Sequence, residues 1–184
     1  MSAYALSRRI VYVSLLALLP FASASQAADT AVNFDGGDDF IYVASSNTLQ
    51  DVTDKSFSWC AWAKPSNNPP TTCSTNNNTC AYGVISRPGY HTNLNYARSG
   101  RFGAEIWTNS TTWNGLSSGV IAPGGWHHLC LAVDDGAKRL HFYVDGAPVA
   151  GSPRSYTGTL RDYRTEPYYI RTGRPNSDWR WHFK

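Results

Sequence analysis

The chain has 184 residues, of which 42% are hydrophobic, 14% aromatic and 16% charged, and its formal net charge is +3. That length suits one domain, and a chain with one Met, two Glu, 15 Gly and 10 Pro is not a helical bundle or a coiled coil. The many aromatic residues argue against a disordered chain, and their place between Gly, Asn and Asp favours strands and turns. We therefore expect a mostly β sandwich.

The N-terminus has the features of a secretory signal peptide. Two arginines (residues 8–9) precede an apolar run of 12 residues (10–21), and the small residues that follow offer cleavage sites after Ala24 and Ala27. A membrane anchor would need about 20 apolar residues, so the run is too short for that alternative. We predict a signal peptide over residues 1–27, no membrane span after its removal, and a secreted, periplasmic or extracellular location.

The charge of the mature chain does not point to nucleic acid. Removal of residues 1–27 lowers the net charge from +3 to +1, because two arginines leave with them. Residues 138–184 are basic, but their arginines are scattered rather than clustered. We predict no nucleic-acid partner.

Strand patterns follow one another along the mature chain. The segment 101–107 alternates between apolar and other residues, and an Asp-Gly pair at 145–146 marks a hairpin turn. The segment 57–64 is apolar on both faces, which predicts a central buried strand. Short strands separated by turns are typical of a sandwich. The predicted strands are 31–34, 40–43, 57–64, 82–87, 93–98, 101–107, 126–133, 139–144, 147–150 and 168–172.

Four cysteines lie in the mature part, at positions 60, 73, 80 and 130. An even number in an oxidising compartment indicates two disulfides, with three pairings open. Cys73 and Cys80 flank a short polar loop that a local bridge closes easily, which leaves Cys60 with Cys130 in two strand-like segments. A zinc site is the alternative, but it expects Cys-x-x-Cys spacing or nearby His ligands.

Four segments, in this order, resemble the laminin G-like, concanavalin A-like jelly roll family: residues 33–43, 57–65, 125–134 and 140–146. The last two, which read GWHHLCLAVD and LHFYVDG, are the most specific. The resemblance covers nearly the whole mature chain and implies an all-β fold of two antiparallel sheets in a jelly-roll sandwich. It also implies a recognition module for glycans or proteins, often calcium-dependent. The pentraxin branch of the family carries its inter-strand disulfide where Cys60 and Cys130 lie.

The chain departs from the family near its C-terminus. Members continue, after a segment like 168–173, into a closing strand with the pattern Gly-x-Ile-Asp-Glu-Val. This chain ends at Lys184 before such a strand, so we predict that residues 28–184 form a single jelly roll domain truncated at its C-terminus. In the family the closing strand pairs with the N-terminal strand. We therefore expect residues 40–43 to lie at an uncovered sheet edge and to favour strand-swapped homo-oligomers.

Calcium is a candidate cofactor only through the resemblance. Pentraxins place acidic and amide ligands ahead of the closing strand, where this chain has Arg174 followed by Asn176 and Asp178. Only these last two residues offer ligand oxygens, and Arg174 adds the wrong charge. They are the metal-ligand candidates, and no other cofactor is predicted.

The sequence lacks the catalytic patterns of enzymes with this fold. A retaining glycosidase needs two carboxylates about 5 Å apart, but Glu105 is isolated and the β-glucanase pattern Glu-x-Asp-x-x-Glu is absent. The Arg-x-Glu, Gln-x-His and Tyr-Phe-Lys patterns of related lyases are absent too, and no nucleophile elbow occurs. We predict a non-catalytic protein. The alternative is a fragment of a larger cell-surface or polysaccharide-degrading protein, a glycosidase or lyase of the same fold.

Several aromatic and polar residues are candidates for ligand binding. Glu105 and Trp107 share the outward face of one predicted strand, and His141 and Tyr143 share that of another. Aromatic rings beside polar groups suit a sugar, because its C–H faces stack and its hydroxyls need hydrogen bonds. Ordinary packing is the alternative for each residue. Two further candidates are predicted in loops: Trp113 and Tyr90. We predict a secreted recognition module that binds glycan or an extracellular protein.

Overall fold

The computed structural model describes residues 31–34, 39–46, 55–69, 81–87, 92–109, 112–160 and 167–170. It divides the chain into residues 1–32 and a larger unit, residues 33–184, which holds every strand found in the described ranges. The predicted signal peptide and the predicted Cys73–Cys80 bridge lie outside the described residues. Within the described ranges, no helix is long and apolar enough to span a membrane.

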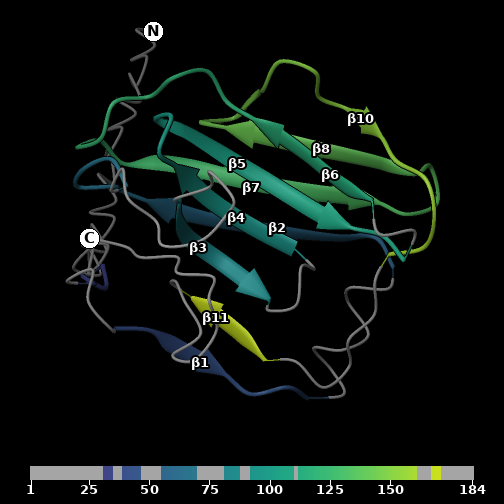
Figure 1. The fold of residues 1–184 in the computed structure, drawn as a ribbon, viewed down its shortest axis with the longest axis horizontal. Helices are drawn as coiled ribbons and strands as arrows, with labels where there is room; N and C mark the ends of the chain where they lie inside the picture. The colour runs from purple at the N-terminus through teal and green to yellow at the C-terminus, as the bar shows by residue number, and fades with distance from the viewer. Residues whose placement is uncertain are drawn as a thin grey trace, which may run out of the picture. The chain divides into compact units, whose positions relative to one another are not determined.

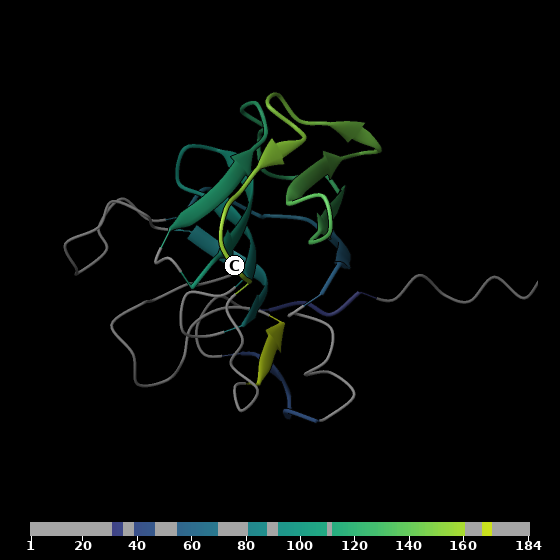
Figure 2. The same cartoon turned by 90° about the vertical axis from the view of Figure 1, so that its right-hand side faces the viewer.

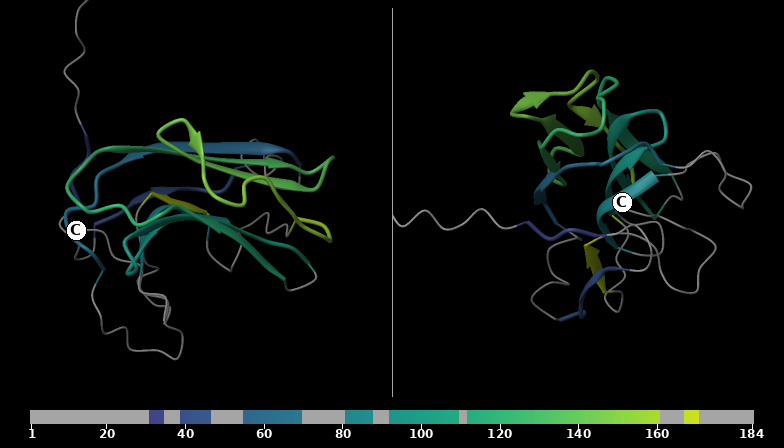
Figure 3. Two further views of the ribbon diagram at one scale, coloured as in Figure 1. Left: turned by 90° about the horizontal axis from the view of Figure 1, so that it is seen from above. Right: turned by 90° about the vertical axis from the view of Figure 1, so that its left-hand side faces the viewer.

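The larger unit contains two antiparallel sheets, which confirms the predicted jelly-roll sandwich. One has six strands in the order β1-β11-β3-β4-β5-β6, and the other has β10-β8-β7-β2 with β9 beside β8 (Figure 1). Seen from above, the blue and green strands of the second sheet form a layer over the teal strands of the first (Figure 3). The strands are β1 Ile41–Val43, β2 Phe57–Ala63, β3 Ala81–Arg87, β4 Thr92–Ala97, β5 Arg101–Trp107, β6 Trp113–Ser117, β7 His127–Asp134, β8 Arg139–Val144, β9 Ala147–Pro148, β10 Arg154–Ser155 and β11 Tyr168–Ile170.

The core lies between the sheets and follows from strand alternation. Every second side chain of a strand points to the same face, so β5 turns Phe102, Ala104 and Ile106 inward, each fully buried. The facing β8 does the same with Leu140 and Phe142. Burial of one such large side chain contributes about 1.5–3 kcal/mol. The opposite faces of β5 and β8 are therefore free to carry function.

The strand β2 corrects one prediction. The apolar segment 57–64 was expected to be a central strand buried on both faces. Instead, β2 ends the five-stranded sheet among the described strands, and its outward residues Cys60 and Trp62 are exposed, Trp62 to 65%. The outward residues made the segment look apolar on both faces because Cys and Trp count as hydrophobic. In the structure one of them forms a disulfide and the other is an exposed indole, and both point to solvent.

The strands β1 and β11 form one end of the six-stranded sheet, where they lie side by side (Figures 1 and 2). Their register pairs Ile41 with Ile170 and Val43 with Tyr168. β1 therefore has a neighbour on one side and ends the sheet among the described strands. The predicted strand-swapped oligomer remains a prediction.

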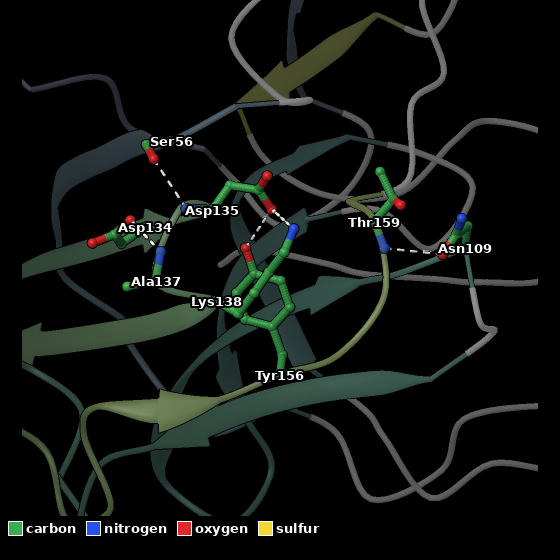
Figure 4. Close-up of polar contacts among 8 residues, drawn as sticks. All are labelled: Ser56, Asn109, Asp134, Asp135, Ala137, Lys138, Tyr156 and Thr159. Carbon is green, nitrogen blue, oxygen red and sulfur yellow. Dashed lines mark hydrogen bonds and ion pairs between the residues drawn. The ribbon is translucent and has the colours of Figure 1, made fainter.

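A polar cluster fixes the turn after β7 (Figure 4). Tyr156 donates its hydroxyl proton to Oδ1 of Asp135 at 2.8 Å, and Lys138 Nζ donates to the same oxygen at 2.6 Å. Burial tends to raise the pKa of Asp135, but the two hydrogen bonds and the Lys138 charge bring it below its ordinary value. Burial, with the Asp135 carboxylate, holds the pKa of Tyr156 far above its ordinary value. The Lys138 ammonium and the Tyr156 hydroxyl both donate to the Asp135 carboxylate, so we assign the cluster a structural role.

Candidate functional site

The outward face of the six-stranded sheet gathers polar and aromatic side chains around Glu105. Because β5 buries Phe102, Ala104 and Ile106, it directs Glu105 and Trp107 outward, as the sequence predicts. In the register, Glu105 lies opposite Asn93 of β4 and Gly115 of β6. Trp107 lies opposite Trp113. We call the outward side chains of Asn93, Asn95, Glu105, Trp107 and Trp113 the Glu105 face.

The Glu105 carboxylate is the centre of a hydrogen-bond network. Nδ2 of Asn95 donates to Oε1 of Glu105 at 3.2 Å, and the side chains of Asn93 and Trp113 also donate to the carboxylate. Burial raises the pKa of the Glu105 carboxyl, and the three hydrogen bonds oppose that shift without cancelling it. Carboxyls with strongly perturbed pKa values are concentrated at functional sites. Among the residues of this face, Glu105 therefore gives the strongest indication of a functional site.

Two glycines allow the larger side chains to lie flat on the sheet. A Cβ atom at Gly115 would lie 2.5 Å from Cζ2 of Trp113, and one at Gly103 would lie 2.7 Å from Oδ1 of Asn95. Any other residue at these positions would displace the indole or the amide. Trp113 keeps 46% of its surface exposed, whereas Asn95 keeps 3%. The face therefore offers an exposed indole fixed above a buried polar floor.

Arg154 brings a positive charge to the edge of this face. Its Nη1 donates to the carbonyl oxygen of Gly115 at 2.9 Å, and its Cζ lies 5.8 Å from the centroid of the Trp113 ring. The residue belongs to β10 of the other sheet, so it closes the edge of β6 from the side. A guanidinium near an indole contributes a cation–π attraction that helps to hold the ring.

The structure corrects the prediction that Trp113 lies in a loop. It is the first residue of β6, where it pairs with Trp107, because Trp113–Ser117 hydrogen-bonds to β5 as a strand. Asn93, Asn95 and Arg154 were not among the predicted binding residues. The alternation in Thr92–Ala97 could have indicated the two asparagines, but nothing local could have indicated Arg154. Three candidates lie outside the described residues: Tyr90, Asn176 and Asp178.

His141 and Tyr143 lie on the other outer face of the sandwich. Both project outward from β8, as predicted, with nearly parallel rings whose centroids are 6.3 Å apart. Trp62 and His128 lie on the same outer face, with their rings 5.2 Å apart. The core separates these residues from Glu105, so the predicted binding residues form two sets rather than one.

The disulfide Cys60–Cys130 is present as predicted. The two cysteines are directly opposite each other on β2 and β7 and are separated by 70 residues in sequence. They lie on the outward side, since the neighbouring Leu129 and Leu131 of β7 are fully buried.

The side chains of His127 and Asp145 meet near the hairpin turn after β8. Nδ1 of His127 lies 2.8 Å from Oδ2 of Asp145, and the His128 N–H donates to Oδ1 at 2.9 Å. These two hydrogen bonds hold the pKa of Asp145 below its ordinary value. Asp145 and Gly146 both have positive φ, 52° and 79°, as the turn of a tight hairpin requires. The pair therefore fixes the hairpin geometry.

In the part of the chain that the structure describes, no three His, Cys, Asp or Glu side chains group together so as to hold a metal ion. The predicted calcium ligands Asn176 and Asp178 lie outside that part, so calcium binding stays a prediction.

Comparisons with known proteins agree with the fold. The family model described as the concanavalin A-like lectin/glucanases superfamily matches residues 35–184. No curated protein matches the chain. Among solved structures, the binding domain of Paraclostridial Mosquitocidal Protein 1 is 12% identical with a TM-score of 0.57, over 78% of this chain and 36% of that one.

Two further similar structures come from sialidases. The Ruminococcus gnavus IT-sialidase CBM40 bound to α2,3-sialyllactose is 10% identical with a TM-score of 0.55, over 78% of this chain and 83% of that one. Trypanosoma rangeli sialidase is 18% identical with a TM-score of 0.47, over 70% of this chain and 19% of that one. At such identities these likenesses concern the fold alone. This chain spans about a third of the mosquitocidal chain, a fifth of the trypanosomal sialidase and most of the CBM40 chain.

Proposed function

The chain belongs to the concanavalin A-like lectin/glucanases superfamily, and from that premise we propose that it is a non-catalytic module that binds glycans through the Glu105 face. The observation that carries the proposal is the exposed Trp113 ring, which a hydrogen bond to Glu105 holds beside a buried polar floor. A flat ring offers a surface for the C–H face of a sugar, and the carboxylate offers an acceptor for a hydroxyl.

The hydrogen-bond capacity of Glu105 supports a role in recognition. Asn93, Asn95 and Trp113 donate hydrogen bonds to the Glu105 carboxyl, whose two oxygens can each accept more than one bond. A donor from a ligand, such as a sugar hydroxyl, can add a further bond to this group. A site built to accept a hydroxyl rejects analogues that lack it, because the buried acceptor is then left unpaired. Glu105 therefore both orients the indole and offers specificity.

The described surroundings of Glu105 offer groups that suit binding. A glycosidase needs a second carboxylate, about 5–9 Å away. The outward register positions next to Glu105 hold Asn93, Gly103, Trp107 and Gly115, none of which is acidic. The described neighbours thus offer donors and flat surfaces, which suit binding.

Glycan-array binding of the purified mature protein tests the proposal. Trp113→Ala and Trp107→Ala should each weaken binding to the retained glycans about two- to twelvefold, because an aromatic contact contributes about 0.5–1.5 kcal/mol. Trp62→Ala is the matched control, since it removes an exposed indole from the outer face of the other sheet. Unchanged binding in both Trp variants, or retention of no glycan, would contradict the proposal. Release of reducing sugar or unsaturated product would show an enzyme instead.

We also propose that the module is exported and that it can form part of a larger protein. The signal-like N-terminus and the disulfide support export. The part-length match to the mosquitocidal chain supports the second idea, since this chain spans only 36% of it. N-terminal sequencing of the exported protein tests cleavage after Ala27. Genomic sequence downstream of the codon for Lys184 tests whether the frame continues into a Gly-x-Ile-Asp-Glu-Val strand.

A further inference from the structure

We propose that the Glu105 face is one part of a longer binding surface that crosses the six-stranded sheet and takes a run of consecutive sugars from a polysaccharide chain. The inference rests on the proposed glycan-binding function and adds the substrate class, a polysaccharide rather than a single terminal sugar. It follows from the residues that the strand register aligns on the outer face of the sheet. We call this aligned set the sheet row: Tyr42, Tyr169, Ser86, Asn93, Glu105 and Gly115.

The sheet row runs across the strands on the side away from the core. Each member lies directly opposite the next, from β1 through β11, β3, β4 and β5 to β6, and residues paired in this way share one side of a sheet. Tyr168 is buried and its ring packs 5.5 Å from that of Trp59 in the other sheet, so the next residue, Tyr169, points outward. Leu94 is fully buried, so Asn93 points outward as well.

The sheet row has an aromatic surface at each end. At the β1 end, the ring of Tyr169 contacts those of Phe40 and Tyr42, with centroid distances of 5.9 and 5.7 Å. Phe40 is 41% exposed and Tyr42 is 56% exposed. At the β6 end, the exposed indole of Trp113 lies over Gly115. Flat rings are therefore available to a ligand at both ends.

The middle of the sheet row offers hydrogen bonds in place of rings. Ser86, Asn93 and Glu105 bring a hydroxyl, an amide and a carboxyl to neighbouring positions on three adjacent strands. Each group can accept a bond from a sugar hydroxyl, and a carboxyl does so whether or not it is ionised. Flat surfaces combined with polar groups match a sugar chain, because C–H faces and hydroxyls recur with every ring.

The length of the sheet row sets the size of the ligand. Four strand spacings separate Gly115 from Tyr169, and at about 4.8 Å each they amount to about 19 Å. A disaccharide covers one aromatic end but does not reach the other. A longer oligosaccharide contacts both ends, and the second contact adds affinity because it forms within the complex.

Oligosaccharide ladders test the inference. The probes are cello-, xylo-, manno- and chito-oligosaccharides, each from the disaccharide to the hexasaccharide, titrated against the purified mature protein. We expect at least one ladder to bind, with an affinity that rises at least tenfold from the disaccharide to the hexasaccharide. The absence of binding to all ladders, or affinities that rise with length in none of them, would overturn the inference.

Variants locate the second contact. Tyr42→Ala and Tyr169→Ala should each weaken hexasaccharide binding about threefold, because each removes one aromatic contact, and leave disaccharide binding at the Trp113 end unchanged. Tyr143→Ala is the matched control, since it makes the same substitution on the outward side of β8 and should change neither affinity. Thermal melts show whether each variant is folded, and the exposed Tyr42 provides a test that does not depend on Tyr169.

The outcomes separate this inference from the proposed function. Hexasaccharide binding that stays unchanged in both tyrosine variants would overturn the inference. The proposed function would still stand if Trp113→Ala weakened binding on the glycan array. Retention of no glycan on that array would overturn both.

Discussion

The indole of Trp113 lies over the backbone of Gly115, two residues further along the same strand, so close that a Cβ atom at Gly115 would lie 2.5 Å from Cζ2 of the ring. Strand alternation directs both positions to the same side of the sheet. Only the missing side chain at Gly115 lets the ring lie against β6 and reach Glu105 with its N–H. The orientation of the exposed aromatic surface therefore depends on a glycine that itself has no functional group.

Gly115→Ala should consequently lower glycan affinity about tenfold while leaving the sandwich folded. The new methyl group displaces the Trp113 ring from β6 and breaks its hydrogen bond to Glu105, so the stacking surface is lost. Isothermal titration with a glycan retained on the array measures the affinity, and tryptophan fluorescence reports the displaced ring. Gly119→Ala is the control, because a Cβ there meets no atom within 4 Å. Equal affinities for the two variants would show that the position of Trp113 does not matter.

Replacement of Cys60 and Cys130 by serine should lower the free energy of unfolding by about 4 kcal/mol. The bond closes a loop with a sequence separation of 70 residues, and the chain-entropy model gives a stabilisation of that size for such a loop. Urea denaturation of the oxidised parent and the double variant measures the difference.

Non-reducing peptide mapping of the parent should also recover Cys73 linked to Cys80. A Cys60–Cys73 or Cys60–Cys80 peptide would contradict the pairing.

Asp145 should make the stability of the protein fall in acid. The bonds from His127 and from the His128 N–H give Asp145 a folded-state pKa below its unfolded value. Its contribution is therefore complete above the unfolded pKa, about 3.9, and is lost as the pH falls below that value through the folded pKa. Asp145→Asn keeps a residue that tolerates positive φ, and it should lower Tm near neutral pH.

Thermal melts from about pH 7 to about pH 2 separate this effect from general acid unfolding. The difference in Tm between the parent and Asp145→Asn should shrink as the pH falls below about 4. Tyr143→Ala, on the outward face of β8, provides a comparison in which no acid-dependent difference is expected. A Tm difference that stays constant down to the lowest pH would show that the carboxylate does not provide the stabilisation.

Strand identity was predictable from the sequence wherever side chains alternate strictly. Arg101–Trp107 and Arg139–Val144 begin and end as predicted, because each alternates a buried apolar face with another face. The same alternation placed Glu105 and Trp107 together. It could not show that His141 lies on the other outer face. Alternation separates inward from outward side chains, but it does not reveal which of the two sheets a strand joins.

The rest of the site depends on contacts between distant segments. Arg154 reaches Gly115 across 39 residues of sequence, a contact that no local pattern encodes. From the sequence alone, Asn93 and Asn95 look like ordinary polar residues on the solvent-facing side of a strand. Only the strand register shows that they lie beside Glu105. The segment 57–64 was predicted to be buried on both faces because Cys and Trp count as apolar residues. The sequence does not show that Cys60 and Trp62 point to solvent.

The disulfide also decides how the sheet would respond to a pulling force. Cys60 and Cys130 form the central one of the seven residue pairs that join β2 to β7, with three pairs on either side. A strand at the end of a sheet is peeled away one pair at a time when tension is applied to the chain. Here peeling from either end would stop after three pairs, because the next link is covalent. A polypeptide anchored at one end and bound at the other could thus bear load through β2 without unzipping.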